Sequence, residues 1–367
     1  MDKKFYKDLP ELVFEYLLSI EKEKFYTFYP ASSGLTENGK KINLGFSCFG
    51  LKIYFMTGNW HKLHQSEKIE WINFINSFQK EETKFPKNSF IDYDFINSYN
   101  NLGIFSELKY IFKSTLNILP NQNFETKQTA LTKAINAETK QAISTLYEVG
   151  AKNTKTLENS FNSKNLLESY LNSLDWSKPW SSGAQFSSLC VYSVTQNHNT
   201  KEYLNNFIEK ILNFETGSYF KNEPKTTREI INGAMKVITG LDWLNVKIHK
   251  PEKLIDFCLN NKPILEGCDI VDFTYVLYKC SKQTDYRKSE INTLFLEFLN
   301  DINKLFIKEE GGFSYFLNSS QTYYYGAKIT SGDNYADIHG TTLCLWAVMM
   351  ILDSLEEKNP NNFIIKP

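Results

Sequence analysis

The chain has 367 residues and a formal net charge of -1, because 41 basic residues nearly balance 42 acidic ones. A balanced charge supplies no summed field for a nucleic acid or an anionic membrane, so we expect neither as a partner. Aromatic residues make up 15% of the chain, and this high share predicts flat side chains that line a cavity as well as fill a core.

The six cysteines predict a reduced, cytoplasmic protein. They fall mostly within apolar helical runs and form no CxxC pair, which is typical of packing residues rather than of disulfides. The N-terminus lacks the pattern of a signal peptide, and no stretch approaches the ~20 apolar residues of a membrane span. We therefore expect a soluble protein without a membrane span.

The first part of the chain predicts one buried helix between two outer ones. A helix is expected over residues 9–23, with Pro10 in its first turn. Residues 43–57 carry Lys52 as their only charge and predict a helix buried on nearly every face. Residues 64–82 carry one apolar stripe and predict an outer helix. None of the ten prolines interrupts a periodic segment, as expected of an all-helical chain.

The alternation of outer and inner helices continues downstream. Outer helices are expected at 105–119, 124–136, 163–175, 200–215, 251–260 and 286–307, and inner helices at 138–150, 181–194, 226–241, 268–280 and 339–352. Inner helices in the middle of the chain recur at roughly the 45-residue length of an αα-hairpin repeat. The last helix is too apolar to be the end cap of an open array. We therefore predict a single domain over residues 1–367, an all-α, (α/α)6 toroid.

A resemblance to a known superfamily supports this fold. It rests first on LGFSCFGLKIYFMTG (44–58) followed by EWINFINSFQKEETKF (70–85), which resembles the inner and outer helix repeat of the terpenoid cyclase and protein prenyltransferase superfamily. It rests also on IVDFTYVLYKC (270–280) and ADIHGTTLCLWAVMMIL (336–352), which resemble the two inner helices that hold zinc in prenyltransferase β-subunits.

The resemblance carries over only part of that zinc site. Asp272 and His339 match the Asp and the His, but Thr274 stands in place of the Cys and is a poor zinc ligand. The DxDD acid motif of class II cyclases is absent as well. The resemblance thus implies the toroid and argues against a zinc prenyltransferase. With five histidines and no HxxxH pair we expect no metal site and no cofactor, unless a diphosphate substrate brings Mg²⁺.

Asp272 and His339 are the candidates for proton transfer. Asp269 and Asp272 begin one inner helix, where carboxylates either cap the helix or, for Asp272, face the cavity with a pKa raised by burial. His339 begins the last helix, where it is either a capping group or an acid or base oriented by Asp337 or Asp272.

The residues expected to bind a substrate lie on three other segments. Arg228, Asn232 and Lys236 form one stripe of the helix at 226–241, which is either a solvated face or, in a double ring, a face that binds an anion. The run SQTYYYG (320–326) and several aromatic residues either fill the core or line the cavity. The further substrate-binding residues that we expect are Trp180, Gln185, Tyr325 and Trp346.

The first functional hypothesis is an isoprenoid enzyme that resembles a class II terpene cyclase. Asp272 would protonate an alkene, with His339 or Asp337 holding it in its protonated, oriented form, and Arg228 and Lys236 would hold an anionic head group. Aromatic side chains would stabilise the carbocation by roughly 0.5 to 2 kcal/mol each.

Two other hypotheses stay open. One is a lyase-like enzyme acting on an acidic glycan or glycan precursor, with Tyr324 and His339 as acid and base and Arg228 neutralising the carboxylate. The other is a binding protein that keeps the toroid without catalysis. A cavity lined mainly by Phe, Tyr and Trp favours the isoprenoid, whereas charged and amide groups that point inward favour the sugar.

Overall fold

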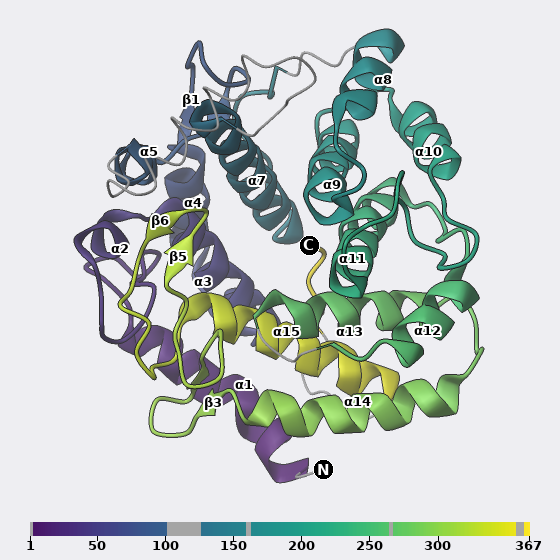
Figure 1. Cartoon of the computed structure of the whole chain (residues 1–367). Helices are drawn as coiled ribbons and strands as arrows, with labels where there is room; N and C mark the ends of the chain where they lie inside the picture. Colours follow the sequence, from purple (N-terminus) through teal and green to yellow (C-terminus); the bar gives the residue numbers. More distant parts are fainter. Residues whose placement is uncertain (1–2, 101–125, 159–162, 264–266, 357–362) are drawn as a thin grey trace.

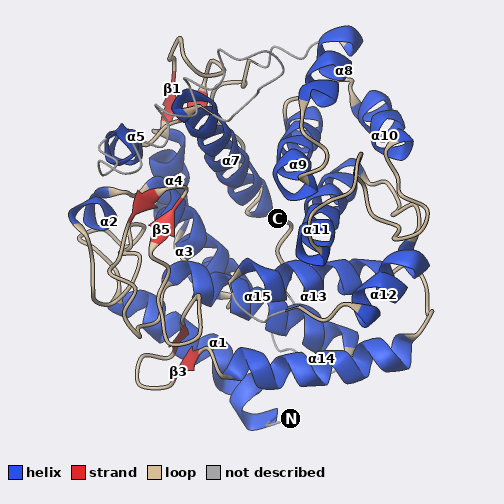
Figure 2. Cartoon of the chain, viewed as in Figure 1, coloured by secondary structure: helices blue, strands red, loops and turns tan. Residues whose placement is uncertain are grey.

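The computed structural model describes residues 3–100, 126–158, 163–263, 267–356 and 363–367. Most of these residues are helical (Figure 2). The strands of the described residues are three short antiparallel pairs: β1 (Gln79–Lys80) with β2 (Ser89–Phe90), β3 (Phe306–Ile307) with β4 (Gly312–Phe313), and β5 (Tyr323–Tyr324) with β6 (Ala327–Lys328). The helix predicted at 105–119 lies outside the described residues.

Within the described part of the chain, six helices form a closed inner ring (Figure 1). They are α3 (Leu44–Met56), α7 (Lys127–Glu148), α9 (Pro179–Thr195), α11 (Thr227–Leu244), α13 (Cys268–Ser281) and α15 (Ile338–Ser354). Each helix packs against the next in this order, and α15 packs against α3 to close the ring.

An outer helix precedes each of these inner helices along the described chain. The outer helices are α1 (Lys3–Ser19), α4 (Gln65–Asn76), α8 (Lys164–Ser173), α10 (Lys201–Lys210), α12 (Pro251–Asn260) and α14 (Lys288–Asn303), and the shorter helices are α2 (Glu37–Lys41), η1 (Asn59–Lys62) and α5 (Tyr93–Asn100). Among the outer helices, α1 packs on α3, α10 packs on α9, and α12 and α14 pack on α13. The predicted all-α, (α/α)6 toroid is confirmed.

The inner helices α3 and α15 are buried because their side chains are apolar on nearly every face. In α3 every residue except Phe55 is buried, and in α15 the burial is nearly continuous from Ile338 to Leu352. The outer helix α4 joins α3 through Trp71, whose indole N–H donates to the Ser47 hydroxyl at 2.9 Å. A helix that is apolar all round has no solvated face, so it forms the inside of a double ring.

Two predicted helices differ from the structure. The segments 124–136 and 138–150, predicted as a peripheral and an inner helix, belong over their described residues to one inner helix, α7. The hydroxyl of Thr126 caps its start by accepting from the N–H of Thr129, and no residue between the two predicted segments breaks it. The outer helices predicted at 64–82 and 286–307 end earlier in the structure. Helix α4 is followed by β1, and helix α14 is followed by β3.

The prediction that the first helix begins at residue 9 is wrong. Helix α1 begins at Lys3 and contains Pro10 in its interior, where proline removes one helical hydrogen bond. Tertiary contacts hold the turn before Pro10: the Tyr6 hydroxyl contacts the carbonyl oxygen of Leu299 at 3.2 Å and the amide oxygen of Asn303 at 3.0 Å, both on α14. These bonds to α14 stabilise the turn of α1 that precedes Pro10.

We expect Gly50→Ala to destabilise the toroid. A Cβ atom at position 50 would lie 2.1 Å from Cε2 of Phe28, a buried side chain that packs against Trp71. Overpacking of this kind costs about 1 to 3 kcal/mol of unfolding free energy, more than alanine gains in helix propensity. Gly183→Ala on α9 is the matched control, because its new Cβ meets atoms no closer than 3.1 Å. Equal losses for both variants in urea denaturation would contradict this packing.

Candidate functional site in the inner ring

A cavity of about 580 Å³ lies inside the inner ring. All six inner helices contribute side chains to its wall, together with the segment that carries β5 and with Ile365 and Pro367 near the C-terminus. The volume falls in the range of small-molecule sites.

The cavity brings together most of the residues predicted from the sequence. The predicted residues that line it are Trp180, Lys236, Asp272, Tyr324, Tyr325, His339 and Trp346. The predicted residues that do not line it are Gln185, Arg228, Asn232 and Asp337.

Arg228 and Asn232 bind a carboxylate of their own chain instead of a ligand. Arg228 Nε donates to Asp269 Oδ1 at 2.8 Å, and Asn232 Nδ2 donates to the same oxygen at 2.7 Å. The Arg228 side chain is 60% exposed and lies 5.2 Å from the centroid of the Trp180 aromatic system. The prediction that the whole stripe faces an anion is therefore wrong, because α13 packs beside α11 and supplies Asp269. Of the three predicted residues, Lys236 alone reaches the cavity.

Gln185 is part of the packing between helices. It is buried on α9, and its amide oxygen lies 3.2 Å from the Tyr170 hydroxyl and 3.4 Å from Nδ2 of Asn136. These partners come from α8 and α7. Its predicted role in substrate binding is replaced by a role in joining three helices.

Asp337 is the N-cap of α15, and its carboxylate accepts from backbone N–H groups rather than from the His339 imidazole. Its carboxylate accepts from the backbone N–H of Gly340 at 2.7 Å, of Tyr315 at 2.7 Å and of Gln321 at 3.0 Å. Three backbone donors occupy the group, so it does not orient the imidazole as predicted. It fixes instead the two loop segments beside the cavity to the start of α15.

Tyr324 reaches the cavity from β5 because Gly45 leaves space for it. A Cβ at position 45 would lie 2.1 Å from the Tyr324 hydroxyl oxygen. That hydroxyl is buried and has no hydrogen-bond partner among the described residues. Burial, and next the nearby carboxylate of Glu138, raise the pKa of Tyr324 well above its usual value. The phenol is thus protonated at physiological pH, and the Glu138 carboxyl group interacts with its hydroxyl.

His339 lies in the first turn of α15 between two aromatic side chains. It stacks on Phe49 with 4.5 Å between centroids, and its centroid lies 5.0 Å from that of Tyr315. Phe49 also contacts Tyr324, at 6.4 Å between centroids. The Nδ1 atom of His339 is buried and has no partner in the part of the chain that the structure describes.

The charge state of His339 follows from its surroundings. Burial, then the charges of Lys236 and Lys52, lower the pKa of His339 to about 3. The imidazole is neutral at physiological pH, and a pKa this low makes it a weak base as long as the cavity is empty. An anion bound near these two lysines would offset their charges and raise the pKa of His339.

Lys52 and Lys140 are the site residues that sequence reasoning missed. Both line the cavity, Lys52 is 8% exposed, and no described carboxylate lies within ion-pair distance of either. Burial, then the charges of Lys236 and Lys52, lower the pKa of Lys140 to about 7. The signal in the sequence was Lys52 itself, the single charge of an otherwise apolar inner helix.

Asp272 forms an ion pair inside the cavity. Its Oδ1 lies 3.6 Å from Lys236 Nζ, and Oδ2 is buried without a hydrogen-bond partner among the described residues. Burial raises the pKa of Asp272 to about 6, while Lys236 opposes this shift. Lys52, Lys140 and Lys236 outnumber Asp272 and Glu229 in the cavity wall, whereas Lys178 pairs with Asp175 at 2.6 Å.

We expect the unfolding free energy to depend on pH because the pKa of Lys140 differs between the folded and unfolded states. Its folded pKa lies below its ordinary value of 10.5, so between about pH 7 and about pH 10 the folded state binds fewer protons than the unfolded state. The unfolding free energy therefore rises with pH over this window. Lys140→Gln should flatten the rise in urea denaturation series, whereas Lys262→Gln, an exposed lysine paired with Glu297, should not. Equal slopes in wild type and Lys140→Gln would contradict a desolvated Lys140.

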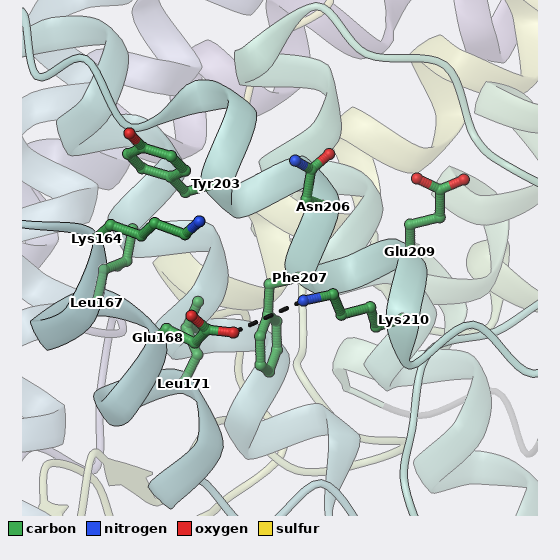
Figure 3. A pocket seen from close by; sticks show the side chains of 9 residues that line it. All are labelled: Lys164, Leu167, Glu168, Leu171, Tyr203, Asn206, Phe207, Glu209 and Lys210. Carbon is green, nitrogen blue, oxygen red and sulfur yellow. Dashed lines mark ion pairs between the residues drawn. The ribbon is translucent and has the colours of Figure 1, made fainter.

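A second pocket, of about 340 Å³, lies between the outer helices α8 and α10 (Figure 3). Figure 3 shows Lys210 directed toward Glu168, and their charged atoms are 3.7 Å apart. The Lys164 ammonium lies 5.5 Å from the centroid of Tyr203. Lys164, Glu168 and Lys210 thus have partners within this pocket, and none of the predicted site residues lies there.

Two general expectations can be compared with the described residues. All six cysteines are free, and five of them are buried. No described helix has both the length and the apolar character that crossing a membrane requires.

Comparisons with known proteins give little further information. No family model matches the chain, and no curated protein matches it. A solved structure titled "Polysaccharide Lyase BACCELL_00875" is similar, with 12% identity over 96% of this chain and 99% of that chain and a TM-score of 0.48. An identity and a TM-score this low establish neither a shared fold nor a shared activity.

Proposed function

We propose that the protein is an enzyme that cleaves an acidic glycan by β-elimination. The observation that carries the proposal is the set of residues in the cavity wall: Tyr324, His339, Lys52 and Lys140 line one cavity, and the Tyr324 hydroxyl and His339 Nδ1 have no hydrogen-bond partner among the described residues. Buried polar groups normally have partners, so groups without one at a cavity wall indicate where a ligand supplies them.

The lysines indicate the charge of the substrate. Lys52 and Lys140 lack a carboxylate partner among the described residues, and burying an ammonium group without a partner is costly. A carboxylate on the ligand would supply the missing charge. In this proposal Lys52 and Lys140 neutralise the substrate carboxylate, the role that the sequence hypothesis assigned to Arg228.

The reaction follows from the protonation states of Tyr324 and His339. His339 takes the proton from the carbon next to the substrate carboxylate, and the electron pair of that bond forms a carbon–carbon double bond. The bond between the neighbouring carbon and the glycosidic oxygen breaks, and Tyr324 donates its proton to that oxygen. Water then returns a proton to Tyr324 and removes one from His339. The lysines stabilise the negative charge that grows on the carboxylate during the first step.

The isoprenoid hypothesis is less well supported. A cyclase needs a protonated acid, but Asp272 pairs with Lys236 and its pKa of about 6 leaves it mostly ionised at neutral pH. Aromatic side chains do line the cavity, yet the ammonium groups of Lys52 and Lys140 would repel the carbocation that those side chains stabilise. Charged groups that point inward favour the sugar.

The proposal is tested by incubating the purified protein with polymers of galacturonate, glucuronate and mannuronate. Elimination leaves a conjugated double bond in the product, which absorbs ultraviolet light and is one water lighter than the hydrolysis product. We expect such products from at least one polymer. Thermal stabilisation by a polymer without any product would favour the binding protein, and cyclised products from farnesyl or geranylgeranyl diphosphate would favour the cyclase.

A further inference from the structure

Residues 363–367 lie across the inside of the inner ring. Figure 1 shows the C-terminus in the middle of the ring, between α7 and α11. Ile365 and Pro367 form part of the cavity wall, and Ile365 is 5% exposed. This segment therefore occupies space that an open toroid would leave free.

Contacts to inner helices hold the segment in place. The indole N–H of Trp243 donates to the carbonyl oxygen of Pro367 at 2.6 Å. The backbone N–H of Lys366 donates to Glu148 at 3.0 Å, and its ammonium group lies 5.0 Å from the centroid of Trp243. Glu148 ends α7, and Trp243 is the next-to-last residue of α11.

A third contact reaches α3. The phenyl side chain of Phe363 packs against Phe55, with 5.3 Å between centroids, and against His61, with 4.8 Å between centroids. Phe55 lies at the end of α3, whereas Phe49, which stacks on His339, lies nearly two turns earlier. The segment thus bridges the C-terminal ends of α3, α7 and α11, away from the acid and the base.

We infer that residues 363–367 close one end of the cavity, so that the substrate enters from the opposite end and only a chain terminus reaches Tyr324 and His339. The inference rests on the proposed function and adds its specificity: the enzyme removes units from the end of an acidic glycan. Ile365 presents apolar surface, and proline has no N–H, so the closed end offers few hydrogen bonds to a further sugar unit.

The experiment compares where the polymer is cut. Wild type, a variant that lacks residues 363–367, and Trp243→Phe, which loses the donor to Pro367, digest the best acidic polymer from the screen. Trp176→Phe is the matched control, because it removes an indole N–H that donates to the Leu171 carbonyl at 2.8 Å, outside the cavity. Size-exclusion chromatography at equal numbers of broken bonds separates terminal from internal cuts.

We expect wild type and Trp176→Phe to release short products while the remaining polymer stays long. The deletion variant should give products of intermediate length from the start. In Trp243→Phe, loss of one hydrogen bond should raise the share of internal cuts by roughly 2- to 12-fold. If the deletion variant does not fold, Trp243→Phe alone tests whether residues 363–367 close the cavity.

The two proposals fail in different ways. Internal cuts by wild type would contradict the inference that residues 363–367 close the cavity. Only terminal cuts by both the deletion variant and Trp243→Phe would contradict it as well. Neither result would contradict the elimination chemistry. Absence of elimination from every polymer would overturn the proposed function, and the inference about chain ends would fall with it.

Discussion

Replacing Tyr324 with Phe should lower the rate of glycan cleavage by about 10²- to 10⁴-fold, the usual contribution of a general acid. The change removes one oxygen atom and keeps the phenyl group that packs against Phe46 and Phe95, with centroids 5.4 and 6.0 Å away. Because the lost hydroxyl forms no hydrogen bond of regular geometry among the described residues and interacts only with the Glu138 carboxyl group, the unfolding free energy should fall by no more than about 1 kcal/mol. Cleavage rates and urea denaturation curves test both statements.

Tyr323→Phe is the matched control for this change. Tyr323 precedes Tyr324 on β5, but its side chain is 57% exposed and does not line the cavity. Loss of its hydroxyl should leave the cleavage rate within a factor of about two, since substitutions on the surface and outside the site have small effects. If the two variants lose equal activity, or if Tyr324→Phe stays active, Tyr324 is not the acid.

Replacing Lys52 with Met should change affinity and stability in opposite directions. Lys52 is nearly buried and has no ion pair with a described carboxylate, so a methionine of similar length removes a charge that burial disfavours, and the unfolding free energy should rise. The same change removes a charge-assisted contact to the substrate carboxylate. We therefore expect the Kd for an acidic oligosaccharide to rise by roughly 10- to 100-fold.

Calorimetric titration and denaturation of the same protein samples test this pair of effects. Lys262→Met serves as the control, because Lys262 is an exposed lysine that pairs with Glu297 on the surface. It should leave the Kd unchanged. A Lys52→Met variant that binds the oligosaccharide as tightly as wild type would show that the lysines of the cavity do not hold the carboxylate.

The architecture follows from the sequence where a helix has one clear environment. Residues 43–57 and 339–352 are apolar on all faces, and the structure confirms them as the neighbouring inner helices α3 and α15. Helix α7 was split in the prediction because its first half is polar and only partly buried, like an outer helix. Pro10 misplaced the start of α1 because contacts from α14, far along the chain, override the local preference.

The site could be predicted where residues stand at the start of an inner helix. Asp272 and His339 were identified in this way, and both line the cavity. Arg228 was misassigned because its partner Asp269 lies on a different helix, and a single sequence does not show which helices are neighbours across a ring. Lys52 was missed because a lone lysine in an apolar helix does not show which groups it faces, and Lys140 was missed because it is one of three lysines in the polar sequence of α7.

The most direct test of the central claim is digestion of the best acidic polymer in water enriched in heavy oxygen, followed by mass spectrometry of the products. Elimination breaks the glycosidic bond without adding water, so we predict unsaturated products that carry no heavy oxygen at early times, before the new reducing end exchanges its oxygen with water, and their loss in Tyr324→Phe. Saturated products with one heavy oxygen atom per cut would mean hydrolysis and would contradict the roles given to Tyr324 and His339.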